Sequence, residues 1–195
     1  MSSDTAAARC VDDQILDAAR TCVLEFGLRR TTLAEIARRA GVSRPTVYRR
    51  WPDTRAVVGD LLTREIGLAV PAPSGAGPMR AQLVAAVAQM ADAVRHHPLF
   101  VKILRSDPEL LITYIVERLG TSQRAIIDHL VPALVAGQAD GSVRAGDPVA
   151  LATMLLLMTQ SAVQSAGMVA DLLPPDALIG ELTVAVDAYL TAPSV

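Results

Sequence analysis

The chain is predicted to be all-α, with about nine helices arranged in two domains. Three observations favour this class. Aromatic residues make up only 3% of the 195 residues, whereas the strong helix formers Ala and Leu are abundant. Apolar residues recur at helical spacing along most of the chain. Several of these runs start at an acid or a proline and stop at a glycine or a proline, as helices do.

The first predicted helix starts at Asp12 or Asp13, either of which can cap it, and ends before Gly27. Its apolar residues recur at i, i+3, i+4, i+7 and i+8. Residues 1–10 are rich in serine and alanine, and we expect them to be frayed. This helix should form the scaffold for the two shorter helices that follow.

Residues 31–51 predict two short helices joined by an abrupt turn. Thr32 and Glu35 have the spacing of a capping box, so a helix should begin directly after Thr32. Gly41 can adopt the positive φ that ends it, and Ser43 is a good N-cap for a second helix. A helix, a three-residue turn with glycine and another helix form the helix-turn-helix pattern. Its second helix enters the DNA major groove.

Positive charge is concentrated at this motif. Residues 29–55 hold eight arginines against two acids, a balance of +6, whereas the rest of the chain balances at −8 and the whole chain at −2. A charge run alone could equally be a solvated helix face. Around caps and a glycine turn of this kind, a basic patch favours binding to nucleic acid.

The segment TTLAEIARRAGVSRPTVYRRW at residues 31–51 resembles the DNA-binding segment of TetR/AcrR-type transcriptional regulators. The shared pattern is a threonine pair, Ile-Ala, Ala-Gly-Val-Ser, a threonine, a tyrosine, a basic residue and an aromatic residue. The resemblance implies a DNA-binding homodimer with a separate ligand-binding domain. Thr54 departs from the pattern, since the family usually has a phosphate-contacting lysine there, and Arg55 follows it. Pro45 replaces a common glycine and removes only an N–H that no helix pairs.

Two kinds of DNA contact are predicted at the motif. Arginine pairs bidentately with guanine, and threonine can meet a thymine methyl group or a phosphate. Helix-start N–H groups and nearby basic or hydroxyl side chains suit phosphates, which position the protein rather than specify sequence. Val47 and Trp51 are predicted to be core, and Tyr48 could also be packed core with its hydroxyl at the surface. The candidate DNA contacts are Thr32, Arg44, Pro45, Thr46, Tyr48, Arg49, Arg50 and Arg55.

A composition change predicts the domain boundary. Asp53 can cap a helix that reaches about residue 69, and residues 70–78 then contain three prolines and two glycines. We therefore place a helix-turn-helix domain at 1–69, with a connecting helix at 53–69, and a second helical domain at 79–195.

The second domain is predicted to dimerise through its last two helices. One starts at Asp147-Pro148 and the other is capped by Asp176, while a further helix should start at Asp107-Pro108-Glu109. Residues 150–170 carry no ionisable side chain, so the helix there should be buried on most sides. A two-fold interface between protomers, forming a four-helix bundle, would cover this apolar surface. The alternative is that both helices face only their own core.

A small, largely apolar effector is implied by the family resemblance. Methionines in the second domain suit an apolar pocket, although a methionine stripe is more often core. The candidate ligand contacts are His97, Tyr114, Met154, Met158 and Gln160.

Other classes of protein lack support in the sequence. The three histidines and two cysteines have no metal-ligand spacing, and neither a G-x-S-x-G elbow nor a phosphate-binding loop is present. We expect no metal, no cofactor and no enzymatic activity. The N-terminus does not resemble a signal peptide, and no apolar run reaches about 18 residues, which predicts a soluble cytoplasmic protein without membrane contact.

The leading hypothesis is a homodimeric repressor that binds double-stranded DNA at a palindromic operator and is released by a small-molecule effector. One alternative is an activator or nonspecific DNA binder of the same fold. Another is a helical protein-interaction dimer that has lost DNA binding, for which Thr54 is the argument.

Overall fold

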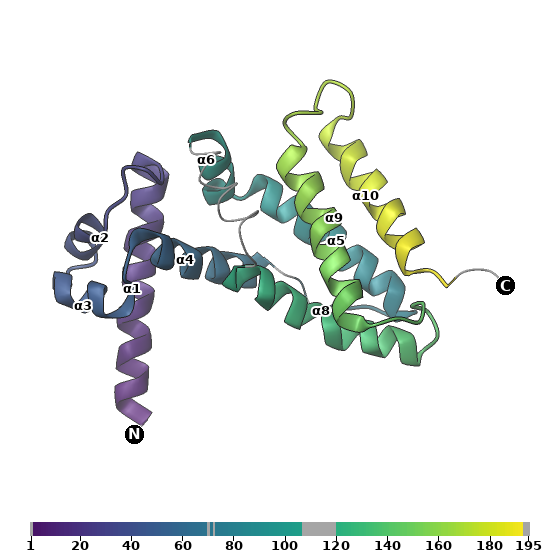
Figure 1. Ribbon diagram of the computed structural model, residues 1–195, viewed down its shortest axis with the longest axis horizontal. Coiled ribbons are helices and arrows are strands. Elements are labelled where there is room, and N and C mark those ends of the chain that lie inside the picture. The colour runs from purple at the N-terminus through teal and green to yellow at the C-terminus, as the bar shows by residue number, and fades with distance from the viewer. Residues whose placement is uncertain (1, 70, 72, 107–119, 193–195) are drawn as a thin grey trace. The chain divides into compact units, whose positions relative to one another are not determined.

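The computed structural model describes residues 2–69, 71, 73–106 and 120–192. These residues form nine helices and no strand, which confirms the predicted all-α class (Figure 1). None of these helices combines the length and apolar character needed to cross a membrane. The predicted helix start at Asp107 and the candidate ligand contact Tyr114 lie outside the described residues. The helices are α1 (Ser2–Phe26), α2 (Leu33–Arg39), α3 (Arg44–Arg50), α4 (Thr54–Ala69), α5 (Met79–His96), α6 (Pro98–Ser106), α8 (Thr121–Ala139), α9 (Pro148–Ser165) and α10 (Pro175–Leu190).

The first helix is longer than predicted. α1 begins at Ser2, so the predicted helix start at a cap near Asp12 is wrong, while the fraying of residues 1–10 stays a prediction. The segment before Asp12 contains no proline or glycine and includes three consecutive alanines, the strongest helix formers. The helix therefore has no local reason to stop before it nears the N-terminus.

Packing divides the described residues into two compact units. The first holds the described residues of Met1–Glu65 and His97–Ser122, and the second those of Ile66–His96 and Gln123–Val195. This grouping differs from the boundaries expected from composition, because α6 packs with the first unit. Leu99 and Ile103 of α6 are buried in the same core as α1.

The core of the first unit joins five helices. Ile15 of α1, Ile36 of α2, Val47 of α3, Leu61 of α4 and Leu99 of α6 are all fully buried in it. Each lies on the apolar stripe of its helix, and together these stripes hold α2 and α3 against α1 and α4.

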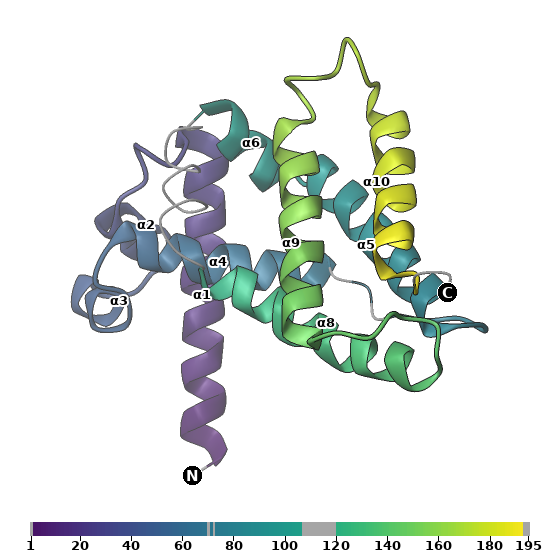
Figure 2. The ribbon, with the colours of Figure 1, turned by 45° about the vertical axis from the view of Figure 1, so that its right-hand side comes forward.

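The second unit is built on α5. Figure 2 shows α9 and α10 running side by side in opposite directions, and both pack against α5. Leu83 of α5, Leu155 of α9 and Val186 of α10 are buried in the shared core, together with Leu134 of α8.

Loops in the second unit cap its helices. Asp140 accepts a hydrogen bond from the backbone N–H of Met79 at 2.9 Å, so this loop caps α5 from a distance in sequence. Asp147 accepts from the backbone N–H of Val149 at 3.1 Å and caps α9 as predicted. The predicted cap at Asp176 is wrong, because α10 already begins at Pro175 and Asp176 lies in its first turn. Proline at the first helical position has a suitable φ and allows this earlier start.

Candidate DNA-binding surface

The helix-turn-helix geometry follows from three local devices. The Thr32 hydroxyl accepts from the backbone N–H of Glu35 at 3.2 Å and caps α2. Gly41 has a φ of 66°, a conformation that is costly for any residue with a Cβ. Ser43 caps α3 by accepting from the backbone N–H of Thr46 at 3.3 Å. The chain therefore turns between α2 and α3 without leaving the start of either helix unpaired.

Two buried side chains fix which face of α3 points outward. Val47 is fully buried and Trp51 is only 5% exposed, as predicted for core positions. The Trp51 indole Nε1–H also donates to the Asp60 carboxylate of α4 at 2.7 Å. This bond links the end of α3 to α4.

The outward face of α3 carries most of the predicted DNA contacts. Arg44, Pro45 and Arg49 are exposed, and Tyr48 is 52% exposed, which argues against a packed-core role for it. Arg44 and Arg49 form no ion pair with any of the described residues. Their guanidinium groups remain available for an external anion or a base edge.

Thr46 lies beside this outward face and is half-buried. Its hydroxyl is 2.8 Å from the Ser43 hydroxyl, either of which could donate. The Thr46 side chain is therefore held at the first turn of α3, next to the exposed Arg44.

Arg50 differs from the other predicted contacts. Its side chain is only 21% exposed, and its Nε forms an ion pair with the Asp12 carboxylate of α1. A DNA phosphate would compete with Asp12 for Arg50.

The remaining candidates lie at helix starts. Thr32 is exposed at the start of α2, where the first N–H groups of the helix point outward. Arg55 is exposed in the first turn of α4, whereas Thr54 beside it is half-buried. Asp53 accepts from the backbone N–H of Ala56 at 2.8 Å and caps α4 as predicted.

Two further arginines pair with acids, Arg39 half-buried and Arg38 with its side chain still 69% exposed. Glu35 accepts from Arg38 at 2.8 and 2.6 Å and from Arg39 at 2.9 Å, and Arg39 also donates to Glu25 at 2.5 Å. Hydrogen bonds from Arg38 and Arg39 lower the pKa of Glu35 to about 2. The Glu35 carboxylate thus accepts hydrogen bonds from arginines. The predicted capping box also requires a bond from the Thr32 N–H to this carboxylate, and that bond is not formed among the described residues.

The predicted ligand contacts are dispersed. His97 belongs to the first unit, where its Nε2 lies 3.1 Å from the buried Glu65 carboxylate. Gln160 accepts a 2.7 Å hydrogen bond from Gln123, and Met158 packs partly buried on the core of the second unit. Met154 is 41% exposed and points away from that core.

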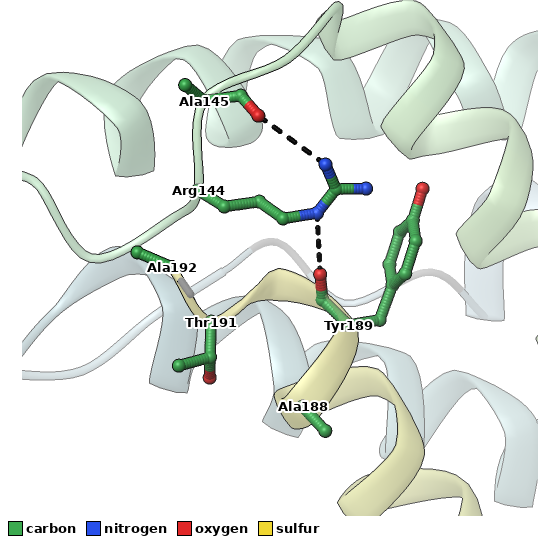
Figure 3. A pocket seen from close by; sticks show the side chains of 6 residues that line it. All are labelled: Arg144, Ala145, Ala188, Tyr189, Thr191 and Ala192. Carbon is green, nitrogen blue, oxygen red and sulfur yellow. Dashed lines mark hydrogen bonds between the residues drawn. The ribbon is translucent and has the colours of Figure 1, made fainter. Parts of the chain in front are cut away.

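A shallow hollow of about 640 Å³ lies elsewhere, at the C-terminal end of α10 (Figure 3). Arg144 stacks on the Tyr189 ring at 4.5 Å, and its Nε donates to the Tyr189 carbonyl at 2.8 Å. Its backbone N–H donates to the Leu190 carbonyl at 2.8 Å. Arg144 therefore pairs with the last carbonyls of α10, a structural role that fits the negative end of a helix. None of the predicted ligand contacts lines this hollow.

The sequence did not predict that three acids bind side chains of the helix-turn-helix: Asp12 pairs with Arg50, Glu25 with Arg39, and Asp60 with Trp51. Each meets its partner across a helix–helix contact between residues that are 9 to 38 positions apart in the chain. No local pattern reports such pairs.

Comparison with known proteins agrees with this geometry. A family profile described as bacterial regulatory proteins, tetR family, matches residues 15–61, from α1 into α4. An uncharacterised HTH-type transcriptional regulator of Mycobacterium bovis is 49% identical over 177 residues, which cover 91% of this chain and 93% of that protein. The chain belongs to the TetR family. This TetR-family protein is a transcriptional regulator with a helix-turn-helix DNA-binding unit, and not an enzyme.

Solved structures share the fold of this TetR-family regulator over nearly its whole length. RolR in complex with resorcinol matches with a TM-score of 0.69 at 15% identity, covering 95% of this chain and 90% of RolR. TylP, a TetR regulator from Streptomyces fradiae, matches with a TM-score of 0.60 at 20% identity, covering 97% and 89%. At these identities the likeness extends to the fold alone.

Proposed function

We propose that this TetR-family regulator is a homodimeric repressor that reads a palindromic operator with α3 and is released by a small, largely apolar ligand. The observation that carries the DNA-reading part is the outward face of α3. Arg44 and Arg49 lie there exposed and without an ion pair among the described residues, while Val47 and Trp51 hold the opposite face in the core.

The exposed side chains of α3 have separate roles in this proposal. Arg44 and Arg49 pair with base edges, guanine being the preferred partner of arginine. Pro45, Thr46 and Tyr48 add close contacts within the groove, and the Tyr48 hydroxyl can also reach a phosphate. Sequence preference therefore depends on the first six residues of α3.

Phosphate contacts flank α3. Thr32 and the free N–H groups at the start of α2 bind one phosphate, since a helix N-terminus favours an anion. Arg55 takes the place of the lysine that the family usually has near position 54. Arg50 reaches phosphate only if it leaves Asp12.

Dimerisation through α9 and α10 places two copies of α3 on one operator. Both helices expose apolar side chains on the surface turned away from α5, including Leu157 and Val184. In helix-turn-helix dimers the half-sites lie about 34–36 Å apart, one DNA turn, so a symmetric protein predicts a symmetric operator.

Release by a ligand is the regulatory part of the proposal. α4 continues from the first unit, whose first segment ends at Glu65, into the second, whose first segment begins at Ile66. A ligand-dependent change in the second unit can therefore reach α3 through α4. A coupling free energy of about 1–3 kcal/mol would change operator affinity by five- to a hundredfold. The solved complex of RolR with resorcinol, a small aromatic diol, supports a small-molecule effector by analogy of fold. Of the four described candidates, Met158 and Gln160 lie half-buried in the second unit and are the ones we expect to contact it, whereas His97 belongs to the first unit and Met154 is exposed.

Operator selection tests the DNA-reading part. The full-length protein is used to enrich a random-sequence duplex library, and the enriched site is footprinted at moderate salt. We expect one palindrome with two protected half-sites. Arg44→Ala with Arg49→Ala should abolish the footprint, whereas Arg105→Ala with Arg124→Ala, two exposed arginines outside this surface, should leave it intact. An intact footprint in the first double variant would refute the assignment of α3.

Compound screening tests the regulatory part. Ligands that raise the thermal stability of the protein are added to the operator complex, and loss of the footprint is measured. A binder that strengthens operator occupancy would favour the activator alternative over ligand-released repression.

A further inference from the structure

The surfaces of α9 and α10 that face away from α5 carry two matching stripes of exposed side chains. In each helix four exposed positions recur at i, i+4, i+7 and i+11, the spacing of one helix seam. The residues between them, such as Leu155 and Val186, are buried against α5. The α9 stripe is Ala150, Met154, Leu157 and Ser161, and the α10 stripe is Ala177, Glu181, Val184 and Ala188.

The two stripes face the same side of the second unit. α9 and α10 pack on each other and both pack on α5, and they run side by side in opposite directions in both views (Figures 1 and 2). Surfaces turned away from α5 therefore form one continuous face. In both stripes the two outer positions carry small side chains and the two middle positions larger ones, so the same face of a second copy related by a two-fold axis can cover the larger side chains in the middle.

Charge on this face is restricted to one residue. α9 has no ionisable side chain, and the charged groups of α10 are all acidic. Asp187 is bonded to Arg80 at 2.6 Å, and Asp176 lies 3.6 Å from Arg95. Glu181 is the one stripe residue with a charge, and it forms no ion pair with the described residues.

We propose that Glu181 limits the affinity of self-association. This rests on the proposed dimer, and the occupant of the face is a second copy of the chain. The eight stripe residues include no cation that would attract a nucleic acid or an anionic membrane, and the dimer proposed above places a second copy on them. In such a copy each Glu181 loses water without gaining a cation, and the two carboxylates repel each other. A polar residue in an apolar seam lowers the stability of the assembly.

The test is sedimentation equilibrium of the full-length protein without DNA. Glu181→Gln keeps the shape and removes the charge, so the dimer dissociation constant should fall by roughly tenfold. Added salt should tighten the wild-type dimer, because it screens repulsion between like charges, and should have little effect on the variant. Asp171→Asn removes an exposed charge from the loop between α9 and α10, outside both stripes, and should change neither quantity.

A second variant separates this proposal from the dimer on which it rests. Leu157→Glu places a charge in the α9 stripe and should give a folded monomer, with helix content checked by circular dichroism. If Leu157→Glu stays as dimeric as the wild type, the proposed dimer surface is wrong. If Leu157→Glu is monomeric but Glu181→Gln dimerises no more tightly than the wild type, the role of Glu181 is wrong while the dimer stands.

Discussion

The ion pair between Arg50 and Asp12 predicts an unusual salt dependence of operator binding. Each phosphate that a basic side chain neutralises contributes about 0.9 to the slope of log affinity against log salt. Arg50 is 21% exposed and paired with Asp12, so we expect it to contribute nothing in the wild-type protein. Arg50→Gln should therefore leave the slope unchanged.

Asp12→Asn is the complementary perturbation. It releases one guanidinium in each protomer, so that two phosphates are newly neutralised in a dimer and the slope should steepen by about 1.8. Between 50 and 200 mM salt, the variant should lose roughly tenfold more affinity than the wild type. Adding Arg50→Gln to Asp12→Asn should restore the wild-type slope.

Fluorescence anisotropy of a labelled operator at four or more salt concentrations measures these slopes, and Arg124→Ala is the control for loss of a distant charge. A shallower slope in Arg50→Gln alone would show that Arg50 already binds phosphate in the wild-type complex. That result would refute the interpretation of Asp12 as its permanent partner.

Three further predictions concern the stability of the fold. Gly137→Ala should destabilise the second unit in urea by about 1–2 kcal/mol, because the added Cβ would lie 2.4 Å from the Val143 side chain. This overpacking outweighs the gain in helix propensity. Combining Gly137→Ala with Val143→Ala should reduce the loss that Gly137→Ala causes alone. Trp51→Phe should cost roughly 0.5–1.5 kcal/mol in urea melts followed by circular dichroism, because it removes the bond to Asp60. The lowered pKa of Glu35 contributes stability that is present above its unfolded value of about 4.5 and is lost as pH falls toward 2. During acid titration, the free energy of unfolding of Glu35→Gln should not show this loss. An equal decrease in the free energy of unfolding of both proteins would contradict the prediction.

Local rules account for what the sequence predicted well. Thr32, Ser43 and Asp53 each cap a helix through a bond to a backbone N–H three residues later, and Gly41 has the expected positive φ. All four depend on interactions within one turn, so neighbouring residue types suffice to predict them. The early start of α10 at Pro175 was missed because two consecutive prolines permit more than one first position.

Contacts between distant segments account for what the sequence did not predict. The position of α6 in the first unit depends on burial of Leu99 and Ile103 beside α1, whereas composition suggested a boundary at residues 70–78. Met154 fits a buried apolar helix by its neighbours in sequence, yet it is 41% exposed because only one side of α9 meets the core. The candidate ligand residues came from a family expectation rather than a pattern, and the described residues do not bring them into one site.

The position of Trp51 also makes this chain its own optical reporter. It is the only tryptophan, and it lies in the first unit at the end of α3. Intrinsic indole emission therefore follows the DNA-reading half of the protein alone, while far-ultraviolet signals sum the helices of both halves. Coincident melting curves from the two signals would mean that the halves unfold as one cooperative body, and separated curves that each melts by itself.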